Sequence, residues 1–284
     1  MNPVGVIGVG VIGGGFVEEL RDAERDVLAF DLDQDRMDWA VEQGAEAASS
    51  PADVGDRAEC VILALPGTPE VAETLLGTGR VLAGDTPQLV IDASTTLPET
   101  SIRCQEACEE AGVSFVEAPI TGGSPRTGMH MMVGGTTEDS DTATQVLDIL
   151  CAGHRRIGKV GDAMIFKLGL QLRYAGHHAI DAEVISFLRD NGVDPAPLVD
   201  FLEFDVFDRY FTEDYHQDIS GLGGFAIWKK DIGYAASVAH EENTALPLTT
   251  VVHEAYKSAG KRLKPDERHA AALIRYWEAL NDQG

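Results

Sequence analysis

Short apolar runs alternate with stretches of helical periodicity through the first half of the chain. Strands are predicted where β-branched and aliphatic residues cluster, at 4–7, 27–30, 60–65, 89–92, 113–116 and 129–133. Helices are predicted between them, at 11–24, 35–43, 69–76, 98–111 and 139–151. This alternation is typical of a doubly wound, largely parallel sheet, so we expect an α/β domain.

The pattern changes after Gly158. One long helix without proline is predicted at 162–190, and residues 195–284 show helical periodicity with no convincing strand. The prolines of this region stand where helix starts are expected: Pro195, Pro197, Pro247 and Pro265. We therefore predict two domains, 1–160 with the doubly wound sheet and 161–284 with a long interdomain helix leading into an all-α domain.

The composition is that of an ordinary globular protein. Of the 284 residues, 44% are hydrophobic and 24% are charged. No stretch approaches the roughly 18–20 apolar residues of a membrane span, and the N-terminal residues lack the positively charged region of a signal peptide. We therefore expect a cytoplasmic protein with no membrane partner.

The net charge of the protein argues against some classes of binding partner. There are 47 acidic and 22 basic residues, so the formal net charge is −25. A surface of this sign repels the phosphates of nucleic acid and anionic lipid, so neither is expected to bind. It also repels an anionic small molecule, so such a substrate requires positive charge placed locally.

The cysteines give no sign of a metal site or of a disulfide framework. Cys60, Cys104, Cys108 and Cys151 show no C-x-x-C spacing, which fits a reduced compartment. Cys104 and Cys108 are four residues apart on a predicted helix, but no histidine or second cysteine pair accompanies them. We expect no metal.

A glycine-rich turn follows the first predicted strand and opens the first predicted helix. It reads Gly8-Val9-Gly10-Val11-Ile12-Gly13, the G-x-G-x-x-G pattern of a Rossmann dinucleotide site. Gly8 permits the tight turn, Gly10 lets a pyrophosphate approach the backbone, and Gly13 lets the helix pack closely on the sheet. The N–H groups at the helix start, at Val11 and Ile12, bind phosphate without any lysine. Two alternatives remain, a purely structural turn and a methyltransferase loop.

An acidic residue ends the second predicted strand. Asp31 stands 18 residues after Gly13, close to the spacing of the carboxylate that binds an adenosine ribose hydroxyl. Asp33 adds a second negative charge, and no arginine immediately follows the strand. A 2′-phosphate would meet two carboxylates there, so the sequence favours NAD over NADP.

Four further segments resemble those of one enzyme family. They are Asp92–Pro98 (DASTTLP), Glu117–Gly123 (EAPITGG), the pair Gly161 and Lys167, and Lys230-Asp231-Ile232. In this order they resemble the β-hydroxyacid dehydrogenases, the group that includes 3-hydroxyisobutyrate dehydrogenase and tartronate semialdehyde reductase within the 6-phosphogluconate dehydrogenase-like superfamily. The resemblance implies an NAD-dependent oxidoreductase that interconverts a β-hydroxy acid and its semialdehyde or keto acid, as a homodimer or homotetramer.

The resemblance also implies roles for individual residues. Lys167 is the general acid/base, and Gln171 stands where the family has an asparagine that hydrogen-bonds the substrate. The substrate carboxylate is expected at Thr121, Gly122 and Gly123, with local positive charge from Lys230. The remaining expected cofactor contacts are Leu65, Pro66, Ser94, Thr95 and again Lys230.

The chemistry of the lysine agrees with this reading. Oxidising an alcohol requires a group that accepts the hydroxyl proton while a hydride leaves for the nicotinamide. Lys167 lies between apolar residues (Met164, Ile165, Phe166 and Leu168), where an unpaired ammonium is costly. Gln171, Tyr174 and His178 share its helix face. For Tyr174 and His178 we favour ordinary packing.

Several departures from the family pattern leave the substrate open. Thr121 replaces serine, Gln171 replaces asparagine, and Leu170 replaces a residue that is often polar. The stretch from Gly123 to Gly134 is a few residues shorter than usual. The aromatic segment 201–211 indicates a bulkier, more apolar substrate if it lines the pocket, and nothing about the substrate if it forms core or a subunit contact.

Three other functions on the same fold remain as alternatives. A decarboxylating 6-phosphogluconate dehydrogenase shares the lysine but not Gln171 and Tyr174. An imine reductase usually lacks this lysine and prefers NADPH. An NAD-binding sensor would retain the fold without catalysis. The sequence also leaves open whether Lys229 or Lys230 faces the site.

Overall fold

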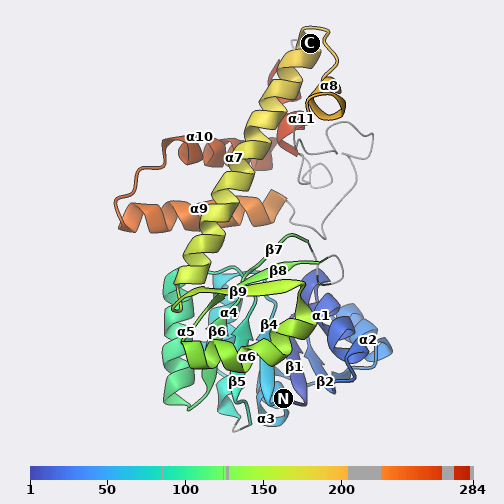
Figure 1. The fold of residues 1–284 in the computed structure, drawn as a ribbon, viewed down its shortest axis with the longest axis vertical. Coiled ribbons are helices and arrows are strands. Elements are labelled where there is room, and N and C mark those ends of the chain that lie inside the picture. The colour runs from blue at the N-terminus through green and yellow to red at the C-terminus, as the bar shows by residue number, and fades with distance from the viewer. Residues whose placement is uncertain (85, 124, 126–127, 204–224, 264–271, 282–284) are drawn as a thin grey trace. The chain divides into compact units, whose positions relative to one another are not determined.

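The computed structural model describes the chain except residues 85, 124, 126–127, 204–224, 264–271 and 282–284 (Figure 1). It divides into two compact units, Met1–Lys167 and Leu168–Gly284. The first unit holds β1 (Val4–Ile7), α1 (Val11–Asp22), β2 (Val27–Phe30), α2 (Gln34–Glu42), β3 (Glu46–Ala47), α3 (Pro51–Arg57), β4 (Cys60–Leu63), α4 (Thr68–Leu76), a 3₁₀ helix (Val81–Ala83), β5 (Leu89–Asp92), α5 (Pro98–Glu110), β6 (Ser114–Glu117), β7 (Ile120–Thr121), β8 (His130–Gly134), α6 (Thr137–Leu150) and β9 (Gly153–Gly158).

The first unit is built on one sheet of nine strands. Its order is β3-β2-β1-β4-β5-β6-β8-β7, with β9 paired to β8. From β3 to β6 every pairing is parallel, and β8 runs antiparallel to β6 and β7. The chain crosses from one side of β1 to the other between β2 and β4, which makes the edge beside β1 and β4 a topological switch point. The doubly wound α/β fold is confirmed.

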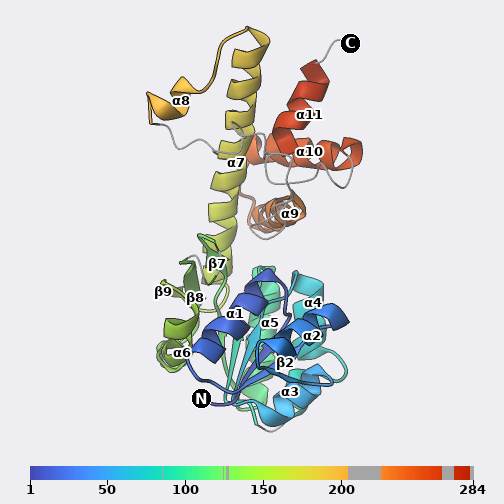
Figure 2. The same cartoon turned by 90° about the vertical axis from the view of Figure 1, so that its right-hand side faces the viewer.

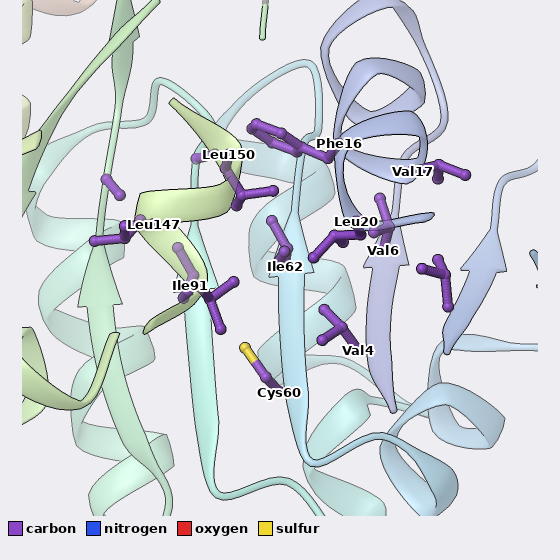
Figure 3. Close-up of a cluster of buried hydrophobic side chains, with 14 of the residues drawn as sticks. Val4, Val6, Phe16, Val17, Leu20, Cys60, Ile62, Ile91, Leu147 and Leu150 are labelled. Atoms are coloured by element: carbon purple, nitrogen blue, oxygen red, sulfur yellow. The ribbon is translucent and has the colours of Figure 1, made fainter. Parts of the chain in front are cut away.

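Helices cover both faces of this sheet (Figure 2). On one face, side chains of α1 and α6 pack against β1, β4 and β5 in a buried cluster that includes Phe16, Leu20, Ile62 and Leu147 (Figure 3). On the other face, residues of α3, α4 and α5 form a second cluster with the alternate positions of the same strands. Both faces are buried, which explains why the strands are continuous apolar runs. Cys104 and Cys108 belong to the second cluster and are fully buried.

The sequence pattern misses three strands and one α-helix of the first unit, as well as the 3₁₀ helix Val81–Ala83. Strands β3 and β7 have two residues each, too few for any periodicity to show. Strand β9 carries the polar sequence GHRRIG and is only partly buried, so it has no hydrophobic signal. Helix α3 has seven residues and contains both Pro51 and Gly55.

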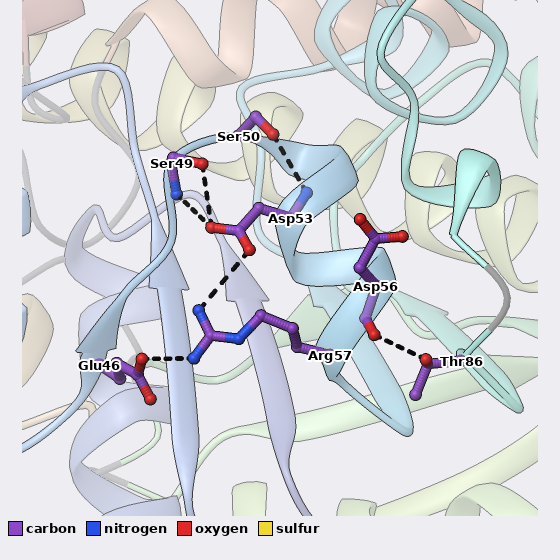
Figure 4. Close-up of polar contacts among 7 residues, drawn as sticks. All are labelled: Glu46, Ser49, Ser50, Asp53, Asp56, Arg57 and Thr86. Carbon is purple, nitrogen blue, oxygen red and sulfur yellow. Dashed lines mark hydrogen bonds and ion pairs between the residues drawn. The ribbon is translucent and has the colours of Figure 1, made fainter.

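Helix α3 is held by local polar contacts in place of a long apolar face (Figure 4). The hydroxyl of Ser50 accepts from the Asp53 amide at 3.1 Å, and the Asp53 carboxylate accepts from the Ser49 amide at 2.7 Å. Arg57 pairs with Asp53 at 3.6 Å and with Glu46 of β3. The Ser49 bonds are the main reason that the pKa of Asp53 lies below its usual value. These contacts tie the edge strand β3 to the helix that follows it.

The second unit is helical throughout its described part. Helix α7 (Asp162–Asp190) begins in the first unit and continues into the second, where α8 (Pro197–Asp200), α9 (Phe225–Glu241), α10 (Pro247–Arg262) and α11 (Ala272–Asn281) follow. Its apolar core includes Trp228 and Tyr256. The long helix predicted at 162–190 is confirmed, and so are the starts at Pro197 and Pro247. Within the described ranges, no helix is long and apolar enough to cross a membrane.

Candidate functional site

The glycine loop lies between β1 and α1, at the switch point of the sheet. Gly8 has a φ of +89°, a left-handed conformation that favours glycine, and a Cβ there would collide with the Ala64 carbonyl oxygen. A Cβ on Gly13 would collide with the Gly8 carbonyl oxygen. These two glycines therefore serve the tight turn and the close packing of α1 on the sheet.

Gly10 is different because nothing lies within 4 Å of where its Cβ would stand. It is the N-cap of α1, and no side chain caps this helix, whereas Asp33 caps α2 and Thr136 caps α6. Val11, the first residue of α1, is 45% exposed. An accessible helix N-terminus with open backbone beside it suits a pyrophosphate.

Asp31 is tied to the glycine loop. One oxygen of its carboxylate accepts from the Val9 amide at 2.6 Å, and the other accepts from the Asp33 amide at 3.0 Å. The structure therefore brings together the expected phosphate loop and the expected ribose-binding acid. A carboxylate has further lone pairs with which to accept from hydroxyl groups.

Ser94 joins the loops that follow β4 and β5. Its hydroxyl accepts from the Leu65 amide at 3.0 Å, and its own amide donates to the Asp92 carboxylate at the same distance. Pro66 and Thr95 are the next residues of these two loops. All four expected contacts thus lie at the carboxyl ends of neighbouring strands, the edge at which sheets of this kind bind ligands.

The Thr121-Gly122-Gly123 segment begins on β7 and ends in a glycine turn. Thr121 pairs with His130 of β8, and Gly122 and Gly123 have φ values of +86° and +120°. Further along, Pro125 packs against α1, where a Cβ on Gly15 would come within 2.8 Å of the proline Cγ. Pro125, two residues beyond the expected substrate segment, is therefore in contact with the helix that follows the expected phosphate loop, and the sequence analysis did not predict this contact.

Glu117, the last residue of β6, binds the start of α7. Its Oε1 accepts from the amides of Gly161, Ala163 and Met164 at 2.8, 2.9 and 3.2 Å. The side chain is completely buried. Sequence reasoning quoted Glu117 within a motif but gave it no role, because its partners are more than 40 positions away in the chain.

Lys167 lies in the second turn of α7 and is 7% exposed. Of the apolar residues around it in the sequence, Met164 and Leu168 are buried, whereas Ile165 and Phe166 are about half exposed. The lysine therefore lies on the buried side of the helix. A lysine on a helix surface is usually exposed, so this burial is unusual.

In the second unit, Gln171 and Lys230 share one carboxylate. The Gln171 amide Nε2 donates to Asp231 Oδ2 at 2.5 Å, and Lys230 Nζ lies 3.2 Å from Asp231 Oδ1. Asp231 is completely buried and Gln171 is 4% exposed. Lys229 is exposed. Lys230 is therefore the member of the pair that is connected to Gln171, and Asp231 is a link that sequence reasoning left without a role.

His178, which shares the Lys167 side of α7, is a packing residue. The ring of His178 stacks on Trp228 with centroids 4.3 Å apart, inside the core of the second unit. Arg173 lies over the Tyr174 ring at 5.9 Å. Of the aromatic segment, Phe201 is 79% exposed, and residues 204–211 lie outside the described part of the chain.

Comparison with known protein families gives two matches that together span most of the chain. Residues 3–161 match the NAD binding domain of 6-phosphogluconate dehydrogenase. Residues 161–277 match the domain described as NAD-binding of NADP-dependent 3-hydroxyisobutyrate dehydrogenase.

Single relatives resemble the chain over nearly its full length. The mitochondrial 3-hydroxyisobutyrate dehydrogenase of Mus musculus is 27% identical over 90% of this chain and 81% of its own. The L-threonate dehydrogenase of Cupriavidus necator is 27% identical over 90% of each chain. A solved structure of Mycobacterium tuberculosis 3-hydroxyisobutyrate dehydrogenase with L-serine shares the fold, with a TM-score of 0.82, 20% identity, and coverage of 98% of this chain and 99% of its own.

Proposed function

This chain belongs to the family of 3-hydroxyisobutyrate dehydrogenase and related β-hydroxyacid dehydrogenases, and we propose that it interconverts a β-hydroxy acid and its semialdehyde or keto acid. The observation that carries the proposal lies within the first unit. A glycine loop shaped for a dinucleotide and a lysine that is 7% exposed occur there together, and the sequence resemblance implies that this lysine is the general acid/base.

The chain's own residues fit an NAD(P) cofactor. The uncapped start of α1 with Gly10, Val11 and Ile12 would bind the pyrophosphate, and the Asp31 carboxylate would accept from ribose hydroxyls. Leu65, Pro66, Ser94 and Thr95 would border the nicotinamide half, with Lys230 as a further contact. When bound, the cofactor would supply the hydride acceptor or donor.

Between the two cofactors we propose NAD. Asp31 and Asp33 both follow β2: the Asp31 carboxylate accepts from the Asp33 amide at 3.0 Å, and the Asp33 carboxylate caps α2 by accepting from the Asp35 amide at 2.9 Å. A ribose 2′-phosphate would be repelled by two negative charges, whereas a 2′-hydroxyl is a hydrogen-bond donor to either.

Lys167 would accept the proton of the substrate hydroxyl and donate it in the reverse reaction. In the oxidation direction a neutral amine accepts the proton of the substrate hydroxyl as that O–H bond breaks and the carbonyl forms. In the reverse direction the ammonium returns the proton to the carbonyl oxygen.

The substrate carboxylate requires local positive charge on a protein of net charge −25. We propose backbone N–H groups of Gly122 and Gly123 with the Thr121 hydroxyl as its binding groups. Gln171 would hydrogen-bond the substrate and Lys230 would contribute the charge, both oriented by Asp231. Such a set of groups would suit an acid with a hydroxyl group near its carboxylate.

One assay tests the proposal against its rivals. Purified protein is mixed with NAD and a panel of 3-hydroxy acids of graded size, and NADH formation is followed. We expect turnover with at least one acid, and the preferred size reports the width of the pocket. NADH binding without turnover across the panel would support a sensor, and turnover confined to cyclic imines with NADPH would support an imine reductase.

We also propose a homodimer or homotetramer and a cytoplasmic location. The exposed apolar residues on α7, among them Ile180, Val184 and Phe187, support association through this helix. Light scattering of the purified protein measures the mass directly, and a monomer at micromolar concentration would contradict the proposal.

A further inference from the structure

The first turn of α7 is anchored by a residue from a distant strand. The chain enters the helix through Gly161, whose φ of +97° favours glycine, so the N-cap position has no side chain with which to satisfy the first N–H groups. Glu117 does this instead, through the three amide bonds to its Oε1. A negative charge at this end of a helix also interacts favourably with the helix dipole.

The surroundings are shaped for this carboxylate. A Cβ on Gly134 of β8 would collide with Glu117 Oε1, so the absence of a side chain on β8 makes room for it. The Asp162 carboxylate, in the same turn of α7, accepts from the Lys159 amide at 3.0 Å. The start of α7 is therefore fixed by two separate carboxylates.

Lys167 stands directly beyond this anchored turn. It follows Ala163 by four residues and Met164 by three, so the three side chains share one side of the helix. All of these residues, with Glu117, belong to the first unit. A shift at the first turn is therefore carried to the lysine within a single turn of helix, about 5 Å along its axis.

We propose that Glu117 is a positioning residue for Lys167: its buried carboxylate fixes the first turn of α7 and thereby the point from which the lysine amine reaches the substrate. This inference rests on the catalytic role proposed for Lys167. Because a charged acceptor binds N–H groups more strongly than a neutral one, the ionised carboxylate is the form that holds the helix best.

The strength with which Glu117 binds the first turn of α7 should depend on pH, because its carboxylate titrates near neutral pH. Burial raises the pKa of Glu117 to about 7, while the nearby Ser101 hydroxyl and the bonds from the three amides lower it. The titratable groups of the described elements around it are Asp92 of β5, in register with Glu117, Asp162 of α7, and Cys104 of α5. Burial raises the pKa of Cys104 to about 12, so this thiol stays neutral near pH 7.

The test compares wild type with Glu117→Gln, which keeps the shape and removes the charge. The matched control is Glu138→Gln, an exposed glutamate in the first turn of α6. We expect Glu117→Gln to lower kcat by about 10- to 100-fold, the scale of a misplaced catalytic group, with the KM for NAD within about twofold of wild type. The wild-type kcat should rise with pH through about 7, and the variant should lack this step.

Ser101→Ala is a second variant that keeps the carboxylate. It removes a group that lowers the pKa of Glu117, so the step in kcat should move to higher pH while the plateau stays. A purely structural role for Glu117 predicts no such movement. The inference would be overturned if kcat rose with pH in Glu117→Gln and Ser101→Ala as it does in wild type, or if Glu117→Gln had the wild-type kcat. Neither result would contradict the proposed function.

Amide hydrogen exchange separates the inference from the function. The amides of Ala163 and Met164 should exchange at least tenfold faster in Glu117→Gln than in wild type, whether or not a substrate is known. Equal exchange would overturn the anchoring. Failure of every hydroxy acid with wild type, together with faster exchange in the variant, would overturn the proposed function alone.

Discussion

The side chain of Gln171 donates to Asp231 at 2.5 Å, and the same carboxylate lies 3.2 Å from the ammonium of Lys230. Two residues that the family resemblance places at the substrate are thus held by one buried acid, which stands 60 positions after Gln171 in the chain. Gln171 has one more methylene than the asparagine of the family. Because its Nε2 donates to Asp231, the amide oxygen Oε1 is the atom that can accept a hydrogen bond from a substrate.

Replacing this acid should therefore weaken substrate recognition. In Asp231→Asn the volume is kept, but the charge that orders Lys230 is lost, and hydrogen bonds to charged groups contribute about 1.5–3 kcal/mol. We expect kcat/KM for the hydroxy acid to fall by about 10- to 100-fold. Steady-state kinetics measure this, with Glu241→Gln, an exposed acid on the same helix α9, as control. Equal values for Asp231→Asn and the control would show that Asp231 does not orient the pair.

Two glycines of the phosphate loop should respond differently to alanine. A methyl group on Gly10 meets no atom within 4 Å, so Gly10→Ala should leave the thermal unfolding midpoint close to that of wild type and weaken NADH binding by at least about tenfold, because the pyrophosphate needs that space. A methyl group on Gly13 collides with the Gly8 carbonyl, so Gly13→Ala should lower the unfolding midpoint.

Calorimetry and a fluorescence titration with NADH measure both effects. Tight NADH binding by Gly10→Ala would mean that the phosphates bind elsewhere.

The choice between cofactors should depend on Asp31. In the structure the Val9 amide donates to the Asp31 carboxylate at 2.6 Å. Asp31→Asn keeps an oxygen that can accept this bond and removes the charge that would repel a 2′-phosphate. We expect the ratio of kcat/KM for NAD to that for NADP to fall by at least about tenfold, the scale of one lost charge–charge interaction near the surface. Parallel kinetics with both cofactors give the ratio. Asp35→Asn, an exposed acid of α2, should leave it unchanged.

Glu117 should make a contribution to the stability of the protein that falls as pH rises. Its pKa is about 7 in the folded chain and near 4.5 in the unfolded chain, so between these values the folded chain keeps a proton that the unfolded chain releases. The contribution of Glu117 to stability is therefore fully present below about pH 4.5 and is lost as pH rises through about 7, by roughly 3 kcal/mol in total.

Glu117→Gln cannot titrate, so its unfolding temperature relative to wild type should rise between pH 5 and pH 8. The comparison uses thermal unfolding at several pH values, with Glu138→Gln measured alongside. A difference between Glu117→Gln and wild type that stays constant with pH would show that Glu117 does not titrate in this range.

The sequence predicted what depends on local pattern. The helix at 162–190 and the strands at 4–7, 27–30 and 89–92 have the bounds found in the structure, because their apolar periodicity is long or flanked by clear turns. The glycine loop and Asp31 also follow from spacing within one strand–helix–strand unit.

What the sequence did not predict depends on contacts between distant segments. The bonds from Glu117 to the start of α7, the link from Gln171 to Asp231, and the packing of Pro125 on Gly15 each join residues more than 40 positions apart. Strand β9 exists because β8 offers a partner, and its own sequence is polar. Such pairings have no periodic signature, since they are set by the tertiary fold.

Lys167 carries the central claim, and one measurement tests it most directly. Lys167→Met keeps the length and apolar stem of the side chain but has no proton to give or take. With the best 3-hydroxy acid of the panel and NAD, we predict a loss in kcat of at least about 1000-fold, within the range of general acid–base catalysis. The dissociation constant for NADH should stay within about twofold, and Lys229→Met, an exposed lysine of α9, should retain wild-type turnover. Turnover by Lys167→Met within tenfold of wild type would contradict the assignment.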